Sequence, residues 1–475
     1  VKRHATGTPT LVVGCDARYG SSEFATAACR VASAAGVRVL ALPQANPTPL
    51  TSFSMLHFDA DAGVMVTASH NPAPDNGYKV YLGGTVAQGD GRGVQIVPPF
   101  DAEIAAAIEA APPADEVPMN DDLVEAVDPR EEYVACASAL ASGEASARED
   151  LRIVLTAMHG VGAAITSRVL AEAGFSNVSL VEAQAQPDPD FPTVPFPNPE
   201  EAGALDMAIE QAREQGADLI IAVDPDADRC ALAVPDPASE TGWSPLSGDQ
   251  IGSLLGEFLA ERGMTGSLAN SIVSSRLLSR IARAHGLEHH TTLTGFKWIA
   301  RAPGLGFGYE EAIGFCPDPA HVRDKDGIAT SVVAASLVAA LKAQGRSVWD
   351  ELERLARLHG LHVSSPLTFR VEEIEQIASG MARLRAQPPS VLAGSPVVEV
   401  SDLSQGYRGL PPTDGVLVLT EAGDRVIARP SGTEPKLKCY LEVILPVAEG
   451  EPLPWEQARE RLDAIKGAFA EIIGL

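Results

Sequence analysis

The chain has 475 residues, of which 45% are hydrophobic and 21% are charged, as expected for a globular protein that is too long for a single hydrophobic core. Its 36 Lys and Arg residues and 63 Asp and Glu residues give a formal net charge of −27. Such a field repels nucleic acid and anionic membranes, so we expect neither as a partner, and a phosphate-bearing ligand must be held by local positive groups or by a metal ion.

Three segments repeat one pattern of an apolar strand, a polar loop, an Ala-rich helix and a second strand. They are residues 11–42, 153–183 and, in a shorter version, 271–294. Gly36, Gly174 and Gly286 close the predicted helices. Strands that alternate with helices in this way predict βαβ units in a mixed, largely parallel sheet. Three copies predict three related α/β domains.

After about residue 362 the pattern changes to alternating strands, with EAGD as a hairpin turn and a closing helix over 455–474. This predicts a smaller α+β fourth domain. We therefore expect an α/β protein with the domain boundaries 1–145, 146–245, 246–362 and 363–475. Within the second domain, the Pro-rich segment 184–199 predicts an extended loop.

Residues 64–72, VMVTASHNP, place a hydroxyl at the end of an apolar strand. No GxSxG elbow surrounds Ser69, which argues against a Ser-His-Asp hydrolase. On an extended segment Ser69 and His70 would point to opposite faces, so His70 is poorly placed as a direct base. The alternative is that Ser69 carries a phosphoryl group, with Lys79 near enough in sequence to be the general base once it is desolvated.

Residues 217–234, ADLIIAVDPDADRCALAV, place three carboxylates at alternate positions between two apolar strands. A hard divalent cation offsets the repulsion between such groups, and Mg²⁺ is favoured because three carboxylates leave room for water and phosphate oxygens. An EF-hand is excluded by Arg229 at the sixth position and Pro235 at the twelfth. A solvated acidic turn would not normally lie between two buried strands. The predicted ligands are Asp224, Asp226 and Asp228.

Two further stretches carry polar groups suited to a phosphorylated sugar. In RPSGTEPK a guanidinium, two hydroxyls and backbone N–H groups converge in a short loop that suits a phosphate dianion, with a plain β-turn as the alternative. A lysine after a Thr-Gly turn and the acidic pair of GYEEAIG suit sugar hydroxyls, with a solvated turn as the alternative. Residues 322–330, with DKDG, predict a turn and a helix N-cap. The residues concerned are Lys297, Glu310, Glu311, Arg429, Ser431, Gly432, Thr433 and Lys436.

The six cysteines lie far apart and form no CxxC pair. This spacing argues against a zinc site or a disulfide framework and predicts reduced thiols in a cytoplasmic protein. The longest low-polarity stretch, 331–340, is much shorter than a membrane span. The chain begins without Met directly before a predicted strand, so we expect that an N-terminal portion is missing. The sequence is compatible with a monomer or a dimer.

In chain order, TASHNP, DPDADR, GYEEAIG and RPSGTEPK resemble the alpha-D-phosphohexomutase superfamily, the phosphoglucomutases and phosphomannomutases, over essentially the whole chain. The resemblance implies four domains around a central cleft, three of them related mixed-sheet α/β domains and the fourth a smaller C-terminal α+β domain. It also implies an intramolecular phosphotransferase, an isomerase, that interconverts hexose 1-phosphate and hexose 6-phosphate of glucose, mannose or both. The implied cofactors are Mg²⁺ and glucose 1,6-bisphosphate as activator or bound intermediate.

The resemblance also implies residue roles. Ser69 would be phosphorylated, Lys79 would be the general base, and His70 and Arg229 would support the site. The metal would be bound by the phosphate on Ser69 and by the three aspartates. Glu310 and Lys297 would contact sugar hydroxyls, and the loop from Arg429 would clamp the phosphate that does not react.

Two departures from the family pattern leave alternatives open. The family's opening segment, whose Arg faces the phosphoserine, is not in this sequence. The sugar loop has Ala312-Ile313-Gly314 where many hexomutases carry Ser, a form nearer to the branch that includes phosphopentomutases, so a pentose phosphate remains an alternative. A phosphatase would not need the second phosphate clamp, and a sugar-phosphate binder without activity would not need Ser69.

Overall fold

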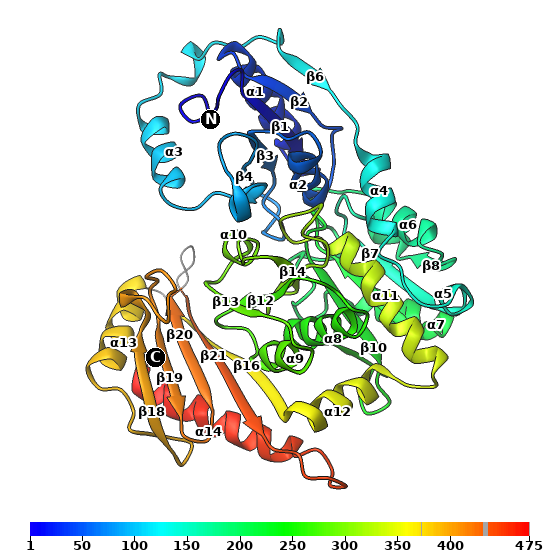
Figure 1. Cartoon of the computed structure of the whole chain (residues 1–475), viewed down its shortest axis with the longest axis vertical. Helices are drawn as coiled ribbons and strands as arrows, with labels where there is room; N and C mark the ends of the chain where they lie inside the picture. Colours follow the sequence, from blue (N-terminus) through cyan, green and yellow to red (C-terminus); the bar gives the residue numbers. More distant parts are fainter. Residues whose placement is uncertain (372, 431–435, 475) are drawn as a thin grey trace. The chain divides into compact units, whose positions relative to one another are not determined.

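The structure is a computed structural model of the chain, and it describes residues 1–371, 373–430 and 436–474. The fold divides into two compact units. The first unit consists of Val1–Ala269 and Gly295–Val348, and the second of Asn270–Thr294 and Trp349–Leu475. Figure 1 shows both units and labels those elements for which there is room.

The first unit opens with a six-stranded sheet in the order β5-β4-β3-β1-β2-β6. Its central strands are parallel, and β4 and β5 are antiparallel additions beside β3. Val12 clusters with Met55 of α2 and Val13 clusters with Cys29 of α1, because neighbouring residues of a strand face opposite sides. The elements are β1 (Thr10–Cys15), α1 (Ser21–Ala34), β2 (Arg38–Ala41), α2 (Thr48–His57), β3 (Ala62–Val66), β4 (Tyr78–Leu82), β5 (Val94–Gln95), α3 (Phe100–Glu109) and β6 (Val124–Ala126).

The second sheet also belongs to the first unit and has the order β11-β10-β9-β7-β8. β7, β8 and β9 are parallel, whereas β10 and β11 are antiparallel. All five residues of β9 are buried. This strand therefore fixes the start of the loop that follows it, which carries Asp224, Asp226 and Asp228. The elements are α4 (Arg130–Ser138), α5 (Ala145–Asp150), β7 (Arg152–Thr156), α6 (Ala163–Glu172), β8 (Asn177–Leu180), α7 (Asp206–Gln215), β9 (Leu219–Val223), β10 (Cys230–Pro235) and β11 (Trp243–Pro245).

The third sheet has the order β13-β12-β14-β15, and the boundary between the two units falls inside β12. β14 and β15 form an antiparallel hairpin. Helix α11, most of which is buried, begins at an N-cap whose carboxylate accepts a hydrogen bond from Ala329 N. The elements are α8 (Gly248–Glu261), β12 (Ser267–Ser271), α9 (Leu277–Ala284), β13 (His289–Thr292), α10 (Phe296–Ile299), β14 (Leu305–Glu310), β15 (Gly314–Cys316), α11 (Gly327–Ala343) and α12 (Val348–His359).

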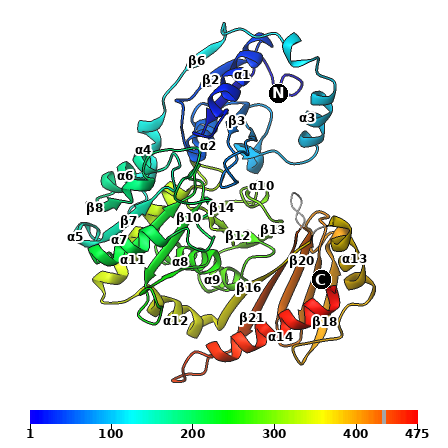
Figure 2. The same cartoon turned by 180° about the vertical axis from the view of Figure 1, so that it is seen from behind.

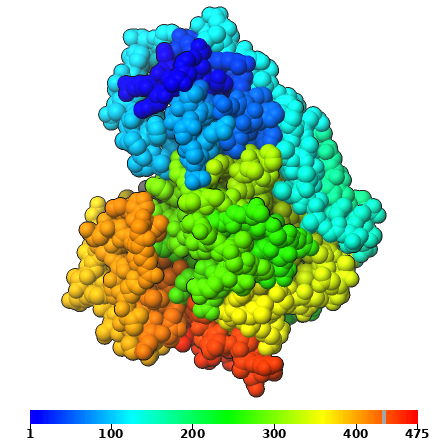
Figure 3. All heavy atoms as spheres, in the orientation of Figure 1, coloured from blue at the N-terminus to red at the C-terminus, as the bar shows by residue number. Residues whose placement is uncertain are grey.

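The second unit contains an antiparallel sheet in the order β16-β21-β20-β19-β18-β17. Figure 2 shows α14 lying across these strands, and Figure 3 shows the atoms of this C-terminal part of the chain in orange and red. One core cluster joins Leu441 of β21 to Leu384 of α13 and Phe469 of α14. The elements are β16 (Leu361–Arg370), α13 (Ile374–Ala386), β17 (Val391–Leu392), β18 (Ser395–Asp402), β19 (Val416–Thr420), β20 (Arg425–Pro430), β21 (Lys436–Leu445) and α14 (Trp455–Ile473).

The predicted fold class is confirmed: three mixed α/β sheets precede an antiparallel C-terminal sheet with its helices. Gly36, Gly174 and Gly286 each follow a helix with a positive φ, of 79°, 90° and 69°, where an L side chain would be strained. One strand was placed wrongly, because β12 ends at Ser271 instead of starting there. The apolar residues Ile272 and Val273 that suggested a strand belong to a core cluster of the second unit.

Among the residues that the structure describes, no single helix has the length and apolar composition to cross a membrane. Helices α11 and α12 pass that test of length and composition only when they are joined, and they are bent by 92° at the break between them.

Candidate active site

The Ser69 loop, residues 67–77, joins β3 to its antiparallel neighbour β4. Thr67 N donates to Gly77 O at 3.0 Å and closes the loop at its base. Thr67 Oγ1 accepts a hydrogen bond from Ser69 N at 2.9 Å. Ser69 has a φ of 52°, in the left-handed region that residues with a side chain adopt rarely. The extended conformation of β3 therefore ends before Ser69. The turn sets the direction in which the Ser69 hydroxyl points.

The Ser69 hydroxyl donates to Asp224 Oδ2 at 2.9 Å and lies 3.1 Å from His70 Nδ1. The prediction that Ser69 and His70 point apart was wrong, because Ser69 is not extended. The arrangement is nevertheless not a hydrolytic triad. In such a triad Ser and Asp bind opposite nitrogens of the imidazole, whereas here Asp224 Oδ2 is 3.9 Å from the same Nδ1.

The imidazole of His70 is half-buried beside three cationic side chains. Burial lowers the pKa of His70 to about 2, and the charges of Arg229, Lys79 and Lys325 act in the same direction. A neutral imidazole has one donor and one acceptor nitrogen. His70 can therefore orient the Ser69 hydroxyl without adding a charge to the site.

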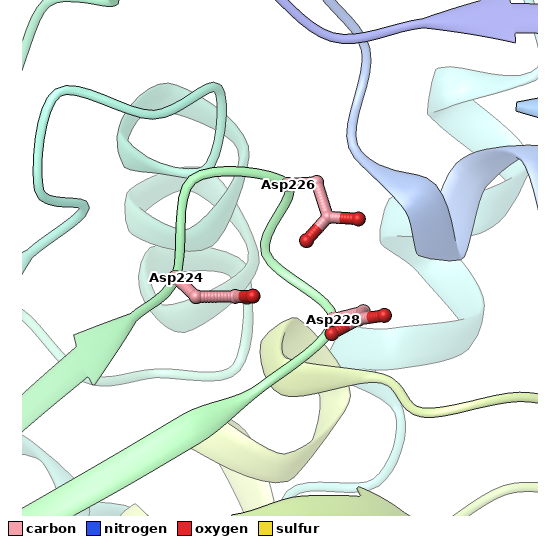
Figure 4. A group of neighbouring side chains, drawn as sticks. All are labelled: Asp224, Asp226 and Asp228. Atoms are coloured by element: carbon pink, nitrogen blue, oxygen red, sulfur yellow. The ribbon is translucent and has the colours of Figure 1, made fainter. Parts of the chain in front are cut away.

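The acidic loop, residues 224–229, connects the buried strands β9 and β10. Asp224, Asp226 and Asp228 are fully buried, and each offers one oxygen within 4.8 Å of the others. Figure 4 shows the three carboxylates pointing toward one space. The turn is made by Ala227, whose N–H donates to Asp224 O at 2.8 Å and whose φ is 57°.

The donor set of this loop fits a divalent cation. Asp226 Oδ1 and Asp228 Oδ1 are buried and accept no hydrogen bond from any residue that the structure describes. Burial raises the pKa of Asp224 well above its ordinary value, and repulsion from Asp226 and Asp228 adds to that effect. Buried carboxylate oxygens without a partner are costly unless a cation binds them, and hard oxygen ligands suit Mg²⁺.

Lys79 on β4 reaches into the acidic loop from the first sheet. Its Nζ donates to Asp226 Oδ2 at 2.6 Å and to Asp228 Oδ2 at 2.5 Å. Burial alone would lower the pKa of Lys79, but the two carboxylates outweigh burial and raise it. In this arrangement Lys79 is an ammonium group that partly neutralises the predicted metal ligands. The general-base role predicted for it remains a proposal.

Two residues at this centre were missed by the sequence analysis. Lys325 Nζ lies 3.1 Å from Asp228 Oδ2, and Thr48 Oγ1 donates to Asp226 Oδ2 at 2.6 Å. Asp326 is the N-cap of α11, as predicted for the DKDG segment. A lysine next to an N-cap is unfavourable because the helix N-terminus is itself positive. That conflict was the available signal that Lys325 has another partner.

Arg229 and Glu310 extend the centre toward the β14–β15 hairpin. Arg229 N donates to Asp224 Oδ1 at 2.9 Å, and Arg229 forms a backbone bridge with Gly314. Burial alone would lower the pKa of Arg229, but Glu310, Asp228 and Asp224 together raise it. A Cβ at Gly314 would lie 2.3 Å from Lys325 Cδ and 3.0 Å from Glu310 Cγ. The glycine therefore leaves the space that these two side chains occupy.

The other predicted sugar contacts lie in the same unit. Glu310 ends β14 and is 7% exposed, and Glu311 follows it in the turn to β15. Lys297 lies in the short helix α10 and is half-buried. The structure thus brings Glu310 next to the acidic loop through Arg229, and it leaves the roles of Lys297 and Glu311 as predictions.

The predicted phosphate clamp lies in the second unit. Arg429 ends β20 beside Pro430, and Lys436 starts β21. Ser431, Gly432 and Thr433 lie outside the described residues. Arg429 pairs with Lys438 and Arg370 pairs with Lys436 across neighbouring strands, and residues directly opposite share a sheet face. These four basic residues therefore lie on one face of the sheet, next to the two ends of the predicted clamp.

Four family models match the chain in order. They are described as phosphoglucomutase/phosphomannomutase alpha/beta/alpha domain I over residues 1–114, domain II over 131–238, domain III over 247–358, and the C-terminal domain over 369–470. The chain belongs to the phosphoglucomutase/phosphomannomutase family. As a member of it, the protein is an intramolecular phosphotransferase, an isomerase.

Relatives within the phosphoglucomutase/phosphomannomutase family cover most of the chain. The "Probable phosphomannomutase" of Haemophilus influenzae is 45% identical over 442 residues, which are 91% of this chain and 88% of that protein. A phosphoglucomutase of Staphylococcus haemolyticus is 34% identical over 466 residues, 92% of this chain and 83% of its own. The crystal structure of a phosphomannomutase candidate from Thermus thermophilus matches with a TM-score of 0.72 at 26% identity and covers 97% of this chain and 90% of its own.

Each predicted stretch of this family member falls in a different matched domain. Ser69 lies in domain I, the acidic loop in domain II, Glu310 and Lys297 in domain III, and Arg429 in the C-terminal domain. The relatives are named as mutases of hexose phosphates, which does not favour the pentose phosphate alternative.

Proposed function

We propose that this mutase interconverts the 1-phosphate and the 6-phosphate of glucose, mannose or both, with a phosphorylated Ser69 as carrier. The phosphomannomutase and phosphoglucomutase relatives support the choice of sugars. The observation that carries the proposal is the 2.9 Å contact between Ser69 Oγ and Asp224 Oδ2. In this contact a hydroxyl lies beside a buried acidic cluster in which two oxygens have no partner among the described residues, so a phosphate and a cation would balance each other there.

The reaction requires two transfers of one phosphoryl group each. In the first, the bond between phosphorus and Ser69 Oγ breaks and a bond to the free 6-hydroxyl of hexose 1-phosphate forms, which gives a 1,6-bisphosphate. The hydroxyl proton leaves to a base. We propose Lys79 for it, as the neutral amine that would result when a cation replaces the contacts of Lys79 with Asp226 and Asp228. In the second, the phosphoryl group on O1 returns to Ser69 Oγ, and O1 takes up the proton. The product is hexose 6-phosphate, and the phosphoserine is restored.

The acidic loop would hold the cofactor. Asp224, Asp226 and Asp228 would bind Mg²⁺ together with an oxygen of the phosphate on Ser69, and the ion would supply charge neutralisation for the transferring group. The side chains of Lys325, near Asp228, and of Arg229, near Glu200, add positive charge beside the loop. Their side chains are positioned to attract the dianion of an incoming sugar phosphate.

The remaining predicted residues would hold the sugar and its second phosphate. We propose Glu310, Glu311 and Lys297 for the hydroxyl groups, because Glu310 pairs with Gly314, which forms a backbone bridge with Arg229 at the edge of the acidic loop. We propose the clamp from Arg429 to Lys436 for the phosphate that does not react, which a planar guanidinium binds well. The six unpaired cysteines support a reducing, cytoplasmic location.

A comparison of three substrates tests the proposal. Glucose 1-phosphate, mannose 1-phosphate and ribose 1-phosphate are each incubated with the protein, Mg²⁺ and a trace of glucose 1,6-bisphosphate. We expect conversion of one or both hexose phosphates, a phosphoserine at position 69 by mass spectrometry, and no turnover by Ser69→Ala. Ser138→Ala, which removes a hydroxyl on α4, is the matched control and should behave like the wild type.

Two outcomes would contradict the proposal. Release of inorganic phosphate at the rate of substrate loss would show a phosphatase. Turnover by Ser69→Ala would show that another group carries the phosphoryl group.

A further inference from the structure

Arg18 follows β1 and lies beneath the Ser69 loop, where it is 5% exposed. Its guanidinium binds the backbone of the loop and no side chain in it. Nη2 donates to Ser69 O at 2.8 Å and to Asn71 O at 2.6 Å, and Nη1 donates to Pro72 O at 2.9 Å and to Asp75 O at 3.3 Å. One side chain thus gathers four carbonyl groups of the Ser69 loop.

The remaining surfaces of the Arg18 guanidinium are also covered by the protein. Nε lies 3.5 Å from Asp16 Oδ2, and the ring of Phe191 lies over the guanidinium carbon at 5.0 Å. Phe191 is buried and comes from the Pro-rich segment 184–199. A guanidinium offers a planar fork of donors. Since these donors face carbonyls and a carboxylate of the protein, Arg18 is placed to orient the loop rather than to bind a substrate phosphate.

The contact with Ser69 O is the one that matters for chemistry. A left-handed backbone is unfavourable at a residue with a side chain and persists only where neighbouring groups impose it. Thr67 Oγ1 fixes the Ser69 N–H on one side, and Arg18 fixes the Ser69 carbonyl on the other. Together these two contacts hold the φ of Ser69 at 52° and direct Ser69 Oγ toward Asp224.

We propose that Arg18 is a positioning residue for the phosphoryl carrier, because its guanidinium holds the Ser69 carbonyl and thereby aims Ser69 Oγ at the acidic loop. This inference rests on the proposed function of Ser69.

The loop has other attachments that do not involve Arg18. Thr67 N binds Gly77 O at its base, and Asn76 Nδ2 donates to Tyr19 O and to Ser21 Oγ, each at 2.9 Å. The loop should therefore stay closed at its base without Arg18 and lose the orientation of the four carbonyl groups that Arg18 holds, that of Ser69 among them. This separates a positioning role from a general contribution to stability.

The test compares Arg18→Gln, Arg18→Lys and Arg18→Ala with the wild type. Misplacement of a reacting group by about 1 Å can cost about 10²-fold in rate, so we expect kcat of Arg18→Gln to fall by about that factor. KM for the sugar phosphate should change by less than about threefold, because Arg18 does not touch the substrate. Arg18→Lys, whose ammonium can still donate to carbonyls, should lie between.

Chemical rescue of kcat distinguishes a positioning role from a purely structural one, which added guanidinium would not restore. Millimolar guanidinium should restore part of the kcat of Arg18→Ala, whereas urea at the same concentration should not. Arg148→Gln is the matched control, because Arg148 donates to Gly143 O at 2.5 Å and is a half-buried arginine of the second sheet's domain. It should keep wild-type kcat with and without guanidinium.

The outcomes separate this inference from the proposed function. Rapid mixing with labelled glucose 1,6-bisphosphate measures phosphorylation of Ser69 directly. A wild type that takes no label at Ser69 would refute the proposed function. A wild type that is labelled, together with an Arg18→Gln variant labelled at the same rate, would refute the role of Arg18. A loss of kcat that only follows the unfolded fraction, measured by circular dichroism, or a rise of KM without a fall of kcat, would also refute it.

Discussion

Two buried carboxylate sites, one in each unit, differ in how their oxygens are engaged. In the first unit, Asp226 and Asp228 each keep one buried oxygen that accepts no hydrogen bond within the described part of the chain. In the second unit, both oxygens of the buried Glu442 on β21 are engaged. Oε1 accepts from Ser275 Oγ at 2.8 Å, from Arg276 N at 2.8 Å, and lies 3.0 Å from His362 Nδ1, while Oε2 lies 2.6 Å from Arg276 Nε and 3.3 Å from Arg425 Nη2.

The difference separates a structural charge from a binding site. Burial raises the pKa of Glu442, but Arg425, His362 and Arg276 outweigh it and hold the pKa well below the ordinary value. For Asp224 burial and neighbouring carboxylates act together, and its pKa is raised. Glu442 is stable as an anion with the partners it has. In the acidic loop burial raises the pKa of Asp226 but Lys79 outweighs burial and lowers it, whereas the pKa of Asp224 stays raised, and Asp226 Oδ1 and Asp228 Oδ1 accept no hydrogen bond from the described residues. These two oxygens are where a cation can bind.

Removing one carboxylate from the acidic loop should abolish its response to a cation. In Asp226→Asn one predicted ligand is lost, and we expect turnover to fall by about 10³-fold, since metal stabilisation of the transition state is several kcal/mol. Mg²⁺ should raise the melting temperature of the wild type, because it binds the native state only, and should not raise that of the variant. An equal shift in both proteins, measured against a chelator, would mean that the loop does not bind the ion.

The position of the acidic loop can be tested without touching a carboxylate. A Cβ at Gly160 would lie 2.3 Å from Pro225 Cα and 2.4 Å from Pro225 O, and backbone atoms cannot move aside as a side chain can. We expect Gly160→Ala to lower the free energy of unfolding by about 1–3 kcal/mol and kcat by about tenfold, because the loop must shift.

Gly467→Ala is the control for this substitution. Gly467 lies in α14 with no atom near its would-be Cβ, so alanine should raise the free energy of unfolding by about 0.5–1 kcal/mol. Equal effects of the two substitutions on denaturation would contradict the close approach at Gly160.

The sequence predicted those parts of the site that one short segment defines. The acidic loop is a turn between two buried strands, so alternation along the chain was enough to bring Asp224, Asp226 and Asp228 together. The N-cap at Asp326 and the left-handed glycines after the helices were predictable for the same reason. Each depends on neighbours a few residues away.

The sequence did not predict contacts that depend on distant segments. The conformation of Ser69 is imposed in part by Arg18, which is far away in the chain, and the extended geometry assumed for Ser69 and His70 was therefore wrong. Lys325 meets Asp228 only because α11 begins beside the acidic loop. Ile272 and Val273 were assigned to a strand because no local pattern shows that they pack with Leu417 and Ile427 of the second unit.

Neutralising Glu442 should affect stability and leave the metal response intact. Loss of one partner from a buried ion pair costs about 3–5 kcal/mol, and we expect Glu442→Gln to show a loss of this size near neutral pH. Because the pKa is depressed in the fold, the stabilisation by Glu442 is present above the ordinary pKa of 4.5 and is lost as the pH falls below it. Denaturation curves of the two proteins should therefore converge in acid.

The same variant sharpens the contrast with the acidic loop. Mg²⁺ should raise the melting temperature of Glu442→Gln by as much as that of the wild type, and turnover per folded molecule should stay within about twofold. A reduced response to Mg²⁺ would contradict the division into a structural carboxylate and a binding site.

Asp326 represents a third way to bury a carboxylate, with a raised affinity for its proton. Its Oδ1 accepts from Ala329 N and from Tyr133 OH, each at 2.8 Å. Burial raises the pKa of Asp326 from its ordinary value of 3.8 to about 7. With a raised pKa, the stabilisation is fully present below 3.8 and is lost as the pH rises through about 7.

Asp326→Asn keeps the acceptor oxygen and cannot ionise. We expect unchanged turnover, and a free energy of unfolding that gains on the wild type as the pH rises across this range. Parallel pH profiles would show that Asp326 is ionised in the folded protein. Asp326, Glu442 and the carboxylates of the acidic loop would then differ only in the positive groups that neutralise them.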